Sequence, residues 1–420
     1  MIIDILINGN NNLNTNYVTW TPANCQIMVT DPQGAINPIR VKLKNQNTNQ
    51  GGQLVFFDLI PGNEQDELQF DLPVDGTPVD FFIAGKFQYQ SEEDRDAVIE
   101  VLDANSGNGL YEIPLMVRIR KNANELTNEE RFRFISALAT LNDRGMGQFT
   151  EFRNTHTNAG ELEAHGDSGF LPWHRAYLLD LERELQRIDP SVTLPYWKFD
   201  EPAPNLFTRD FMGVSPNGRV DFADSNPLFF WTTDGGVGIV RYVFFNSRTS
   251  APLLYDEEKT MLIGERFELF QEMEQNPHNR AHTGFGPFLS DFSTAVRDPL
   301  FFLLHANVDR LWAKWQWYYR RFDITKPETF HRLGRAGNPG STRVGHNLQD
   351  TMWPWNGITG ATDRDRPINA PGGNLAQSLI TNAPGPSPRV GDLIDYRGVM
   401  NRNNYLGFDY DDIPFEFNNS

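Results

Sequence analysis

Residues 162–185, LEAHGDSGFLPWHRAYLLDLEREL, place His165 and His174 close together in a chain that has only 8 histidines among 420 residues. His174 follows a Pro-Trp pair, and proline is favoured in the first turn of a helix. We predict a helix over residues 172–188, since apolar residues recur on one face and a proline follows at 190. Two histidines in such a place more often pack or cap a helix than bind a ligand, so the rest of the chain must decide their role.

The composition is that of a globular chain with a strongly acidic surface. The mass is 48.0 kDa, hydrophobic residues make up 39%, and the formal net charge is −18. This length accommodates about two or three domains. The negative field argues against nucleic acid or an anionic membrane as a partner, and no apolar run is long enough to span a bilayer.

The single cysteine and the N-terminus bear on the compartment. Cys25 is the only cysteine, so no intramolecular disulfide and no thiolate metal cluster can form. The N-terminal stretch MIIDILINGNNN lacks the basic segment and the cleavage site of a signal peptide. We therefore expect a cytoplasmic protein, although an exported protein without disulfides has the same composition.

The first part of the chain is predicted to be β-structure. Short runs rich in β-branched and aromatic residues alternate with Asn, Gly, Pro and Asp, which is typical of strands separated by turns. The runs are IIDILI, CQIMVT, IRVKL, QLVFFDL, VDFFIAG and AVIEVL. This spacing predicts an antiparallel β-sandwich of about seven strands, which we assign to residues 1–112.

The hydrophobic period changes at ELTNEERFRFISALATL, and residues 113–420 are predicted to form a mainly α-helical domain. Thr127 and Glu130 make a capping-box pattern at the start of its first helix. Further helices are predicted over residues 258–275 and over DPLFFLLHANVDRLWAKWQWYYRRF, with Asp298 as N-cap of the latter. The fold class is therefore α+β and multidomain.

Six of the histidines form a pattern of three plus three: His156, His165 and His174, then His278, His282 and His305. The first three lie within 19 residues of one another. The fourth and fifth are spaced i,i+4, so their rings share one face if that stretch is helical. The last lies in the apolar LFFLLHANVDRLW, where an imidazole is costly unless it is hydrogen-bonded or bound to metal.

Six neutral imidazoles without thiolates suit copper, and also zinc, nickel or iron. A zinc hydrolase of the HExxH type is excluded here because Asn279, and not Glu, follows His278. A di-iron carboxylate bundle needs two Glu-x-x-His repeats, and the chain has one, from Glu328 to His331. Two copper ions, each held by three histidines, remain as one reading, beside scattered metal sites or no metal.

Several stretches together resemble the tyrosinases and catechol oxidases, the type-3 copper proteins. HGDSGFLPWHRAYLLDLERELQ is similar to their first copper motif, and NPHNRAHTGFG followed by DPLFFLLHANVDRLWAKWQ is similar to their second. Accessory stretches also match: MVRIRKNANELTNEERFRFISAL, LPYWKFDEP, HNLQDTMWPWNG and YLGFDYDD. The resemblance covers roughly residues 114–412, so the N-terminal β domain is an addition to it.

The resemblance implies two copper ions in a mainly helical domain with a four-helix bundle core, and O₂ as co-substrate. It implies that His156, His165 and His174 hold the first copper, and that His278, His282 and His305 hold the second. The two remaining histidines, His331 and His346, are then expected to be loop or surface residues.

Two positions depart from the pattern of many members. Leu304 replaces the first ring of a double histidine, and Glu163 stands where plant, fungal and molluscan members have a cysteine that forms a thioether to a ligand histidine. We therefore expect this chain to lack the thioether, as bacterial members do.

The resemblance also implies candidates for residues that act around the metals. Asn279 and a glutamate upstream, Glu274 or else Glu272, would hold a water that deprotonates a phenol, whose pKa is about 10. Each ligand ring is expected to donate its second N–H to a fixed acceptor. Asp309 is the candidate for such an outer contact, with Arg175 or Arg310 as its ion-pair partner.

The expected function is a tyrosinase, which hydroxylates monophenols and oxidises o-diphenols to o-quinones. The alternatives are a catechol oxidase or o-aminophenol oxidase, an O₂ carrier like haemocyanin, and a binding protein without catalysis. The expected partners are small phenols and a possible copper-delivery protein; the sequence does not give the oligomeric state. Residues 1–112 have three readings: a lid, a copper shuttle or a stabilising module.

Long segments rich in Gly, Pro and Asn are expected to shape or cover the site. These segments are residues 203–256 and 326–390, and substrate selection is expected to lie with residues 283–297.

Overall fold

The structure, a computed structural model, describes residues 1–12, 15–46, 51–157, 163–242, 253–331, 345–357 and 373–417. Parts of the two long segments predicted to shape a site therefore lie outside the described residues. In the part of the chain that is described, no helix combines the length and the apolar character needed to cross a membrane.

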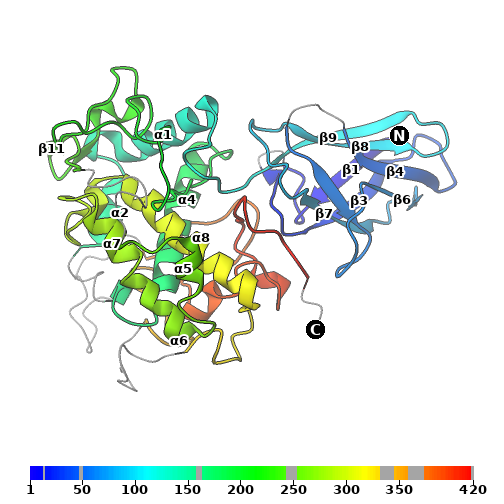
Figure 1. Cartoon of the computed structure of the whole chain (residues 1–420). Coiled ribbons are helices and arrows are strands. Elements are labelled where there is room, and N and C mark those ends of the chain that lie inside the picture. The colour runs from blue at the N-terminus through cyan, green and yellow to red at the C-terminus, as the bar shows by residue number, and fades with distance from the viewer. Residues whose placement is uncertain are drawn as a thin grey trace. The chain divides into compact units, whose positions relative to one another are not determined.

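The chain forms two compact units (Figure 1). The first comprises Met1–Arg120, Ser378–Thr381 and Gly407–Ser420, and the second comprises Lys121–Gln377 and Asn382–Leu406. The predicted boundary between residues 112 and 113 differs from this division, because it falls inside strand β9, Gly109–Val117. That strand pairs with β8, Ala97–Asp103, on both sides of the predicted boundary, so it cannot be divided between two domains.

The first unit contains two β-sheets. One has the order β1-β3-β7-β5, and the other has the order β2-β9-β8-β4-β6. Neighbouring strands are antiparallel, apart from β2 and β9, which are parallel. The remaining bounds are β1 Ile2–Ile7, β2 Tyr17–Val18, β3 Ala23–Asp31, β4 Ile39–Asn45, β5 Leu54–Phe57, β6 Glu67–Leu72 and β7 Val79–Gly85.

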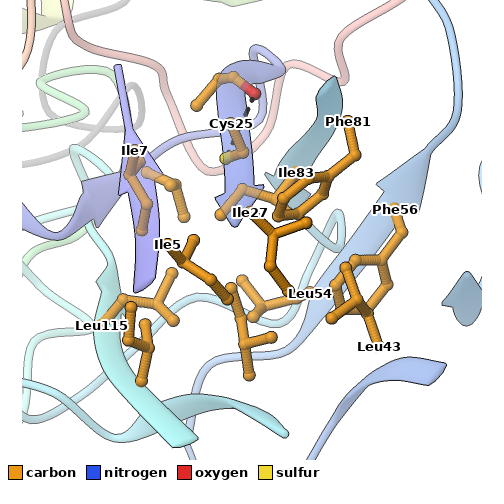
Figure 2. Packing of buried hydrophobic residues seen from close by; sticks show 14 of the residues in the cluster. Ile5, Ile7, Cys25, Ile27, Leu43, Leu54, Phe56, Phe81, Ile83 and Leu115 are labelled. Carbon is orange, nitrogen blue, oxygen red and sulfur yellow. Dashed lines mark hydrogen bonds between the residues drawn. The ribbon is translucent and has the colours of Figure 1, made fainter. Parts of the chain in front are cut away.

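Side chains from both sheets form one hydrophobic cluster. Figure 2 shows Ile5, Ile27 and Ile83 of one sheet in the same cluster as Leu43 and Leu115 of the other. Along β1 and β4 the buried residues, among them Ile5 and Leu43, alternate with exposed or half-buried ones, as expected where one face of a sheet is buried. The same cluster encloses the thiol of Cys25, and burial raises the pKa of this thiol far above its usual value.

The second unit is mainly helical. Its longest helices are α1 (Asn128–Asn142), α4 (Phe170–Ile188) and α8 (Leu300–Tyr319), and α4 packs against both of the others. The predicted capping box is confirmed: the Thr127 hydroxyl accepts the Glu130 N–H, and the Glu130 carboxylate accepts the Thr127 N–H. The shorter elements are α2 Phe149–Thr155, β10 Thr232–Thr233, β11 Gly236–Val237, α5 Glu257–Met261, α6 Phe267–Phe270 and α7 His278–Thr283, with 3₁₀ turns at Asp143–Gly145, Pro227–Phe230, Gln271–Glu274, Ala295–Arg297, Val390–Leu393 and Arg402–Asn404.

The continuous helix predicted over residues 258–275 is wrong. The structure has α5, a break, then α6 and a 3₁₀ turn. Gly264 lies in the break, and Arg266 before α6 is extended, with φ −110° and ψ 141°. Glycine is a poor helix former, and a Cβ at position 264 would lie 2.5 Å from the Cβ of Leu269, so the broken path also brings the chain close to itself.

The starts of the two long helices are close to those predicted. α4 begins at Phe170, which places Pro172 within the first turn and not at its first residue. The N-cap of α8 is Pro299, one residue after the predicted Asp298. The Asp298 carboxylate nevertheless accepts the Leu300 N–H at 2.9 Å and so satisfies one backbone donor of the first turn. Asp298 also forms a fully buried ion pair with Arg241, which holds the preceding loop to this helix start.

Candidate metal centre

Three elements position the first histidine triad. His156 caps the C-terminus of α2, His165 lies in the turn before α4, and His174 lies in the second turn of α4. Their exposed fractions are 1%, 9% and 1%. The ring centroids lie 4.9 to 5.7 Å apart, and one ring nitrogen of each lies within 4.8 Å of the others.

The second triad comes from α7 and α8. His278 and His282 are one turn apart on α7, so the i,i+4 prediction is confirmed, and His305 faces them from α8. The Nε2 atoms of His278 and His282 lie 3.3 and 3.0 Å from Nε2 of His305. Three ring nitrogens therefore converge on one point.

Backbone carbonyls orient three of the rings. The Nδ1 atom of His174 lies 2.9 Å from the carbonyl oxygen of Phe170, one turn earlier in α4. Nδ1 of His278 lies 3.0 Å from the carbonyl oxygen of Glu274, and Nδ1 of His282 lies 2.7 Å from that of Leu289. A carbonyl can only accept, so each Nδ1 carries the proton and each Nε2 keeps its lone pair, as a metal ligand requires.

Burial keeps five of the six rings neutral by lowering their pKa. It lowers the pKa of His156 to about 3 and that of His282 to about 4; in His156 the neighbouring His282 lowers the pKa further. For His174, His278 and His305, burial and then the other histidines hold the pKa well below the usual 6.5. Neutral imidazole is the form that binds metal.

The two triads fit a pair of metal ions. Nε2 of His174 is buried without a hydrogen-bond partner among the described residues, while its Nδ1 is held by the Phe170 carbonyl. Such buried polar atoms are rare unless something else satisfies them. Converging lone pairs in the second triad repel one another unless a cation lies between them. An all-imidazole set of this kind suits copper.

The triads adjoin each other. The rings of His174 and His305 are stacked with centroids 4.2 Å apart, and the rings of His165 and His278 lie 6.1 Å apart. Glu274 adds a further link, because its carboxylate accepts the N–H of Gly166, next to His165, while its backbone holds His278. Two metals bound here would therefore share one site.

A cavity of about 230 Å³ opens onto both triads. Its lining includes His156 and His165 of the first triad and His282 of the second. Asn279, Thr283, Leu289, Ser290, Phe292 and Ala295 complete the described lining. Five of these six residues belong to 283–297, the segment expected to select the substrate.

Asp309 and Arg175 form an ion pair at 2.6 Å, with side chains 2% and 0% exposed. Arg175 also lies over the Trp312 ring at 3.7 Å. Arg310, the other partner considered for Asp309, pairs with Glu257. The proposed contact between Asp309 and a ligand ring stays a prediction, because the orienting contacts recorded for His174, His278 and His282 go to backbone carbonyls.

His346 lies in a loop, as expected, and is fully buried there. Its Nδ1 accepts the N–H of Gly169, the N-cap of α4, at 2.9 Å. Glu163 is buried as well, at 2% exposure. Its carboxylate accepts the N–H of Trp353. Neither contact is visible in the sequence, because Gly169 is 177 residues from His346 and Trp353 is 190 residues from Glu163.

Two adjoining all-imidazole triads in a helical unit define a binuclear copper protein. A sequence model described as the common central domain of tyrosinase matches residues 146–251 and 237–318. A tyrosinase of Streptomyces glaucescens is 35% identical over 268 residues, which cover 57% of this chain and 92% of that protein. A tyrosinase of Streptomyces antibioticus is 31% identical, with 58% and 94% covered.

The chain therefore belongs to the tyrosinase family, and it is a copper oxidoreductase of the tyrosinase and polyphenol oxidase type. Among solved structures, a functional unit of octopus hemocyanin has 21% sequence identity and a TM-score of 0.46, with 71% of this chain and 69% of that chain covered.

Proposed function

We propose that this enzyme uses O₂ to hydroxylate monophenols and to oxidise o-diphenols to o-quinones. The observation that carries the proposal is the pair of adjoining histidine triads, with His156, His165 and His282 lining one cavity. In this proposal His156, His165 and His174 bind the first copper, and His278, His282 and His305 bind the second.

The bound copper pair supplies O₂ binding and the electron transfer. One monophenol and one O₂ give one o-quinone and one water, and two o-diphenols and one O₂ give two o-quinones and two waters. The chain contributes fixed nitrogen donors, because the carbonyls of Phe170, Glu274 and Leu289 hold three of the rings in one tautomer.

The cavity suits a small neutral aromatic ring. None of the described residues that line it is an Asp, Glu, Lys or Arg. Leu289, Phe292 and Ala295 provide apolar walls, and the Phe292 ring lies edge-on to His165 with centroids 4.9 Å apart. A phenol therefore finds ring contacts but no charged partner among these residues, which favours simple phenols as the substrate class.

Hydroxylation of a monophenol requires that its proton be removed, and the two predicted helpers differ in position. Asn279 lines the cavity. Glu274 is buried at 7% exposure, while the second candidate, Glu272, is exposed. We propose that Asn279 and Glu274 hold the water that accepts the phenol proton.

One observation favours the alternative of a diphenol oxidase. The Glu274 carboxylate already accepts the Gly166 N–H at 2.9 Å, and Glu274 is not among the described residues that line the cavity. A catechol needs less help with deprotonation than a monophenol, so such an enzyme would still oxidise o-diphenols or o-aminophenols.

The finer architecture is part of the proposal. We infer that α2, α4, α7 and α8 act as a four-helix core around the metals, since each carries at least one triad histidine at or next to it. The first unit, whose two sheets share one core, is proposed to be a β-sandwich that serves as a stabilising module.

Incubation of the copper-loaded full chain under air with L-tyrosine, phenol and catechol in turn tests the function. Quinone absorbance from phenol and catechol, lost after copper chelation and regained on copper addition, is the expected result. Colour from catechol alone would assign the enzyme as a diphenol oxidase. Absence of colour with all three substrates, despite two bound copper ions per chain, would contradict the proposed activity.

A further inference from the structure

Residues 345–357 form a strap that contacts the helix α4 and the turn before it. One carboxylate oxygen of Asp350 organises the start of the strap by accepting the backbone N–H groups of Gly345, His346 and Asn347, at 3.1, 3.3 and 3.0 Å. The strap then runs through the buried Trp353 and on to Trp355. Hydrogen bonds within the strap therefore fix the conformation of its first residues.

The backbone of Trp353 joins the two segments that carry His165 and His174. Its N–H donates to Oε1 of Glu163 at 2.8 Å, and its carbonyl oxygen accepts the indole N–H of Trp173 at 2.8 Å. Glu163 is two residues before His165, and Trp173 immediately precedes His174. One residue of the strap thus connects the neighbours of two ligands of the proposed first copper.

His346 holds the start of α4. Its Nδ1 accepts the Gly169 N–H at 2.9 Å, and Gly169 as N-cap has no side chain that could cap the helix. Because Nδ1 accepts, the ring proton resides on Nε2. A fully buried imidazole therefore acts as an external cap for the helix that carries His174.

The fit between strap and helix is close enough to require glycine at two points. Gly345 has φ +88°, and a Cβ there would lie 2.6 Å from Cγ of Glu163. A Cβ at Gly169 would lie 2.3 Å from the carbonyl oxygen of Gly345. No side chain can separate these segments, so their spacing is fixed by direct contact.

We propose that Glu163 and His346 are positioning residues that hold His165 and His174 in the geometry required by the first copper. This inference rests on the proposed ligand assignment. The second triad lies on α7 and α8. None of the three hydrogen bonds between the strap and Glu163, Gly169 or Trp173 involves one of its histidines. Loss of the strap contacts is therefore expected to weaken the binding of the first copper more than that of the second.

Glu163→Leu removes the acceptor for the Trp353 N–H and replaces the carboxylate with an apolar side chain of similar size. Glu182→Leu is a matched control: Glu182 also lies in the second unit, is 2% exposed, and accepts a backbone N–H, that of Leu194, at 2.9 Å. Both variants lose one buried carboxylate and one amide contact, but Glu182 lies two turns beyond His174. Glu163→Gln is the rescue variant, since its Oε1 still accepts the Trp353 N–H.

The copper-loaded full-length variants are titrated with a copper chelator, and the copper that remains per chain is measured together with the Cu(II) EPR signal. For Glu163→Leu we expect one of the two copper ions to bind about 10- to 100-fold more weakly, the usual effect of losing an outer contact to a metal ligand. An EPR signal from isolated Cu(II) should then appear as that ion leaves, because the coupled pair is EPR-silent. His346→Leu should act in the same direction, and Glu163→Gln should retain the wild-type affinity.

Wild-type binding of both copper ions by Glu163→Leu would overturn the proposal. Equal weakening of both ions, matched by Glu182→Leu, would also overturn it, because the effect would then be a general loss of stability. If Glu163→Leu does not fold, Trp173→Phe takes its place, since it removes the indole donor to Trp353 and keeps an aromatic ring at this buried position. A wild-type chain that binds fewer than two copper ions would instead contradict the proposed function, so the two failures are distinct.

Discussion

The imidazole rings of His174 and His305 stack in parallel, with centroids 4.2 Å apart and planes 9° apart. His174 belongs to α4 and the first triad, and His305 belongs to α8 and the second. These two rings lie where the triads meet, so the packing of α4 on α8 would set the distance between two metals bound there.

Replacement of His305 should remove one metal. In His305→Ala the second triad keeps only two nitrogens, so we expect about one copper per chain by elemental analysis and loss of catechol oxidation. His331→Ala is the control, since His331 belongs to neither triad, and it should keep both copper ions. Two copper ions in His305→Ala would show that the second triad is wrongly assigned.

The buried Arg175–Asp309 pair should be costly to break on one side. Arg175→Met leaves the Asp309 carboxylate buried without its guanidinium, and we expect a loss of about 3–5 kcal/mol in the free energy of unfolding. The double replacement Arg175→Met with Asp309→Leu should recover much of that loss, because no charge is then left unpaired.

Urea unfolding measures both effects, with Glu201→Gln as control. Glu201 pairs with Lys198 at 3.6 Å, and its side chain is 55% exposed, so its loss should cost less than about 1 kcal/mol. A double variant no more stable than Arg175→Met would show that the pair is not the cause.

Asp180 should make the stability of the second unit depend on pH. Burial raises its pKa from the usual 3.8 to about 6, although the Trp355 indole and the Ala376 N–H donate to its carboxylate. The folded state then binds the proton more tightly than the unfolded state. The stabilisation is full below about pH 3.8 and is lost as the pH rises through about 6.

The difference in Tm between wild type and Asp180→Asn measures this contribution. We expect the wild type to gain relative to the variant as the pH falls from about 7 to about 4. Asp224→Asn, at an exposed carboxylate, should show no such trend. A difference in Tm that is independent of pH would contradict the raised pKa.

Asn279 should matter more for monophenols than for o-diphenols. In Asn279→Ala we expect kcat/KM for phenol to fall by about 10²-fold or more, as for loss of general base assistance, with a smaller change for catechol. Thr283→Ala is the control, because Thr283 lines the same cavity. Equal losses for both substrates in Asn279→Ala would remove the reason for assigning monophenol hydroxylation.

Local patterns predicted much of the helical unit and the composition of the site. The Thr127 and Glu130 capping box and the apolar runs of α4 and α8 depend on neighbours within one or two turns, which the sequence displays. The i,i+4 spacing of His278 and His282 likewise fixes their common face.

Strands β6 and β9 were not predicted, for a different reason in each case. In β6, ELQFDL, charged or polar residues alternate with apolar ones, and its pairing with β4 at the sheet edge explains the alternation. β9 contains Pro114 and crosses the predicted domain boundary, and its pairing with β8 is what makes it a strand.

The sequence by itself determined which six histidines offer nitrogen donors, which helices carry most of them, and which family they resemble. Only the tertiary structure decided that His174 stacks on His305, and that the buried Glu163 and His346 tie the strap to α4. The physical reason is range: helix caps and periodicity act between residues a few positions apart, whereas these contacts join residues more than 100 positions apart and exist only after the chain has packed.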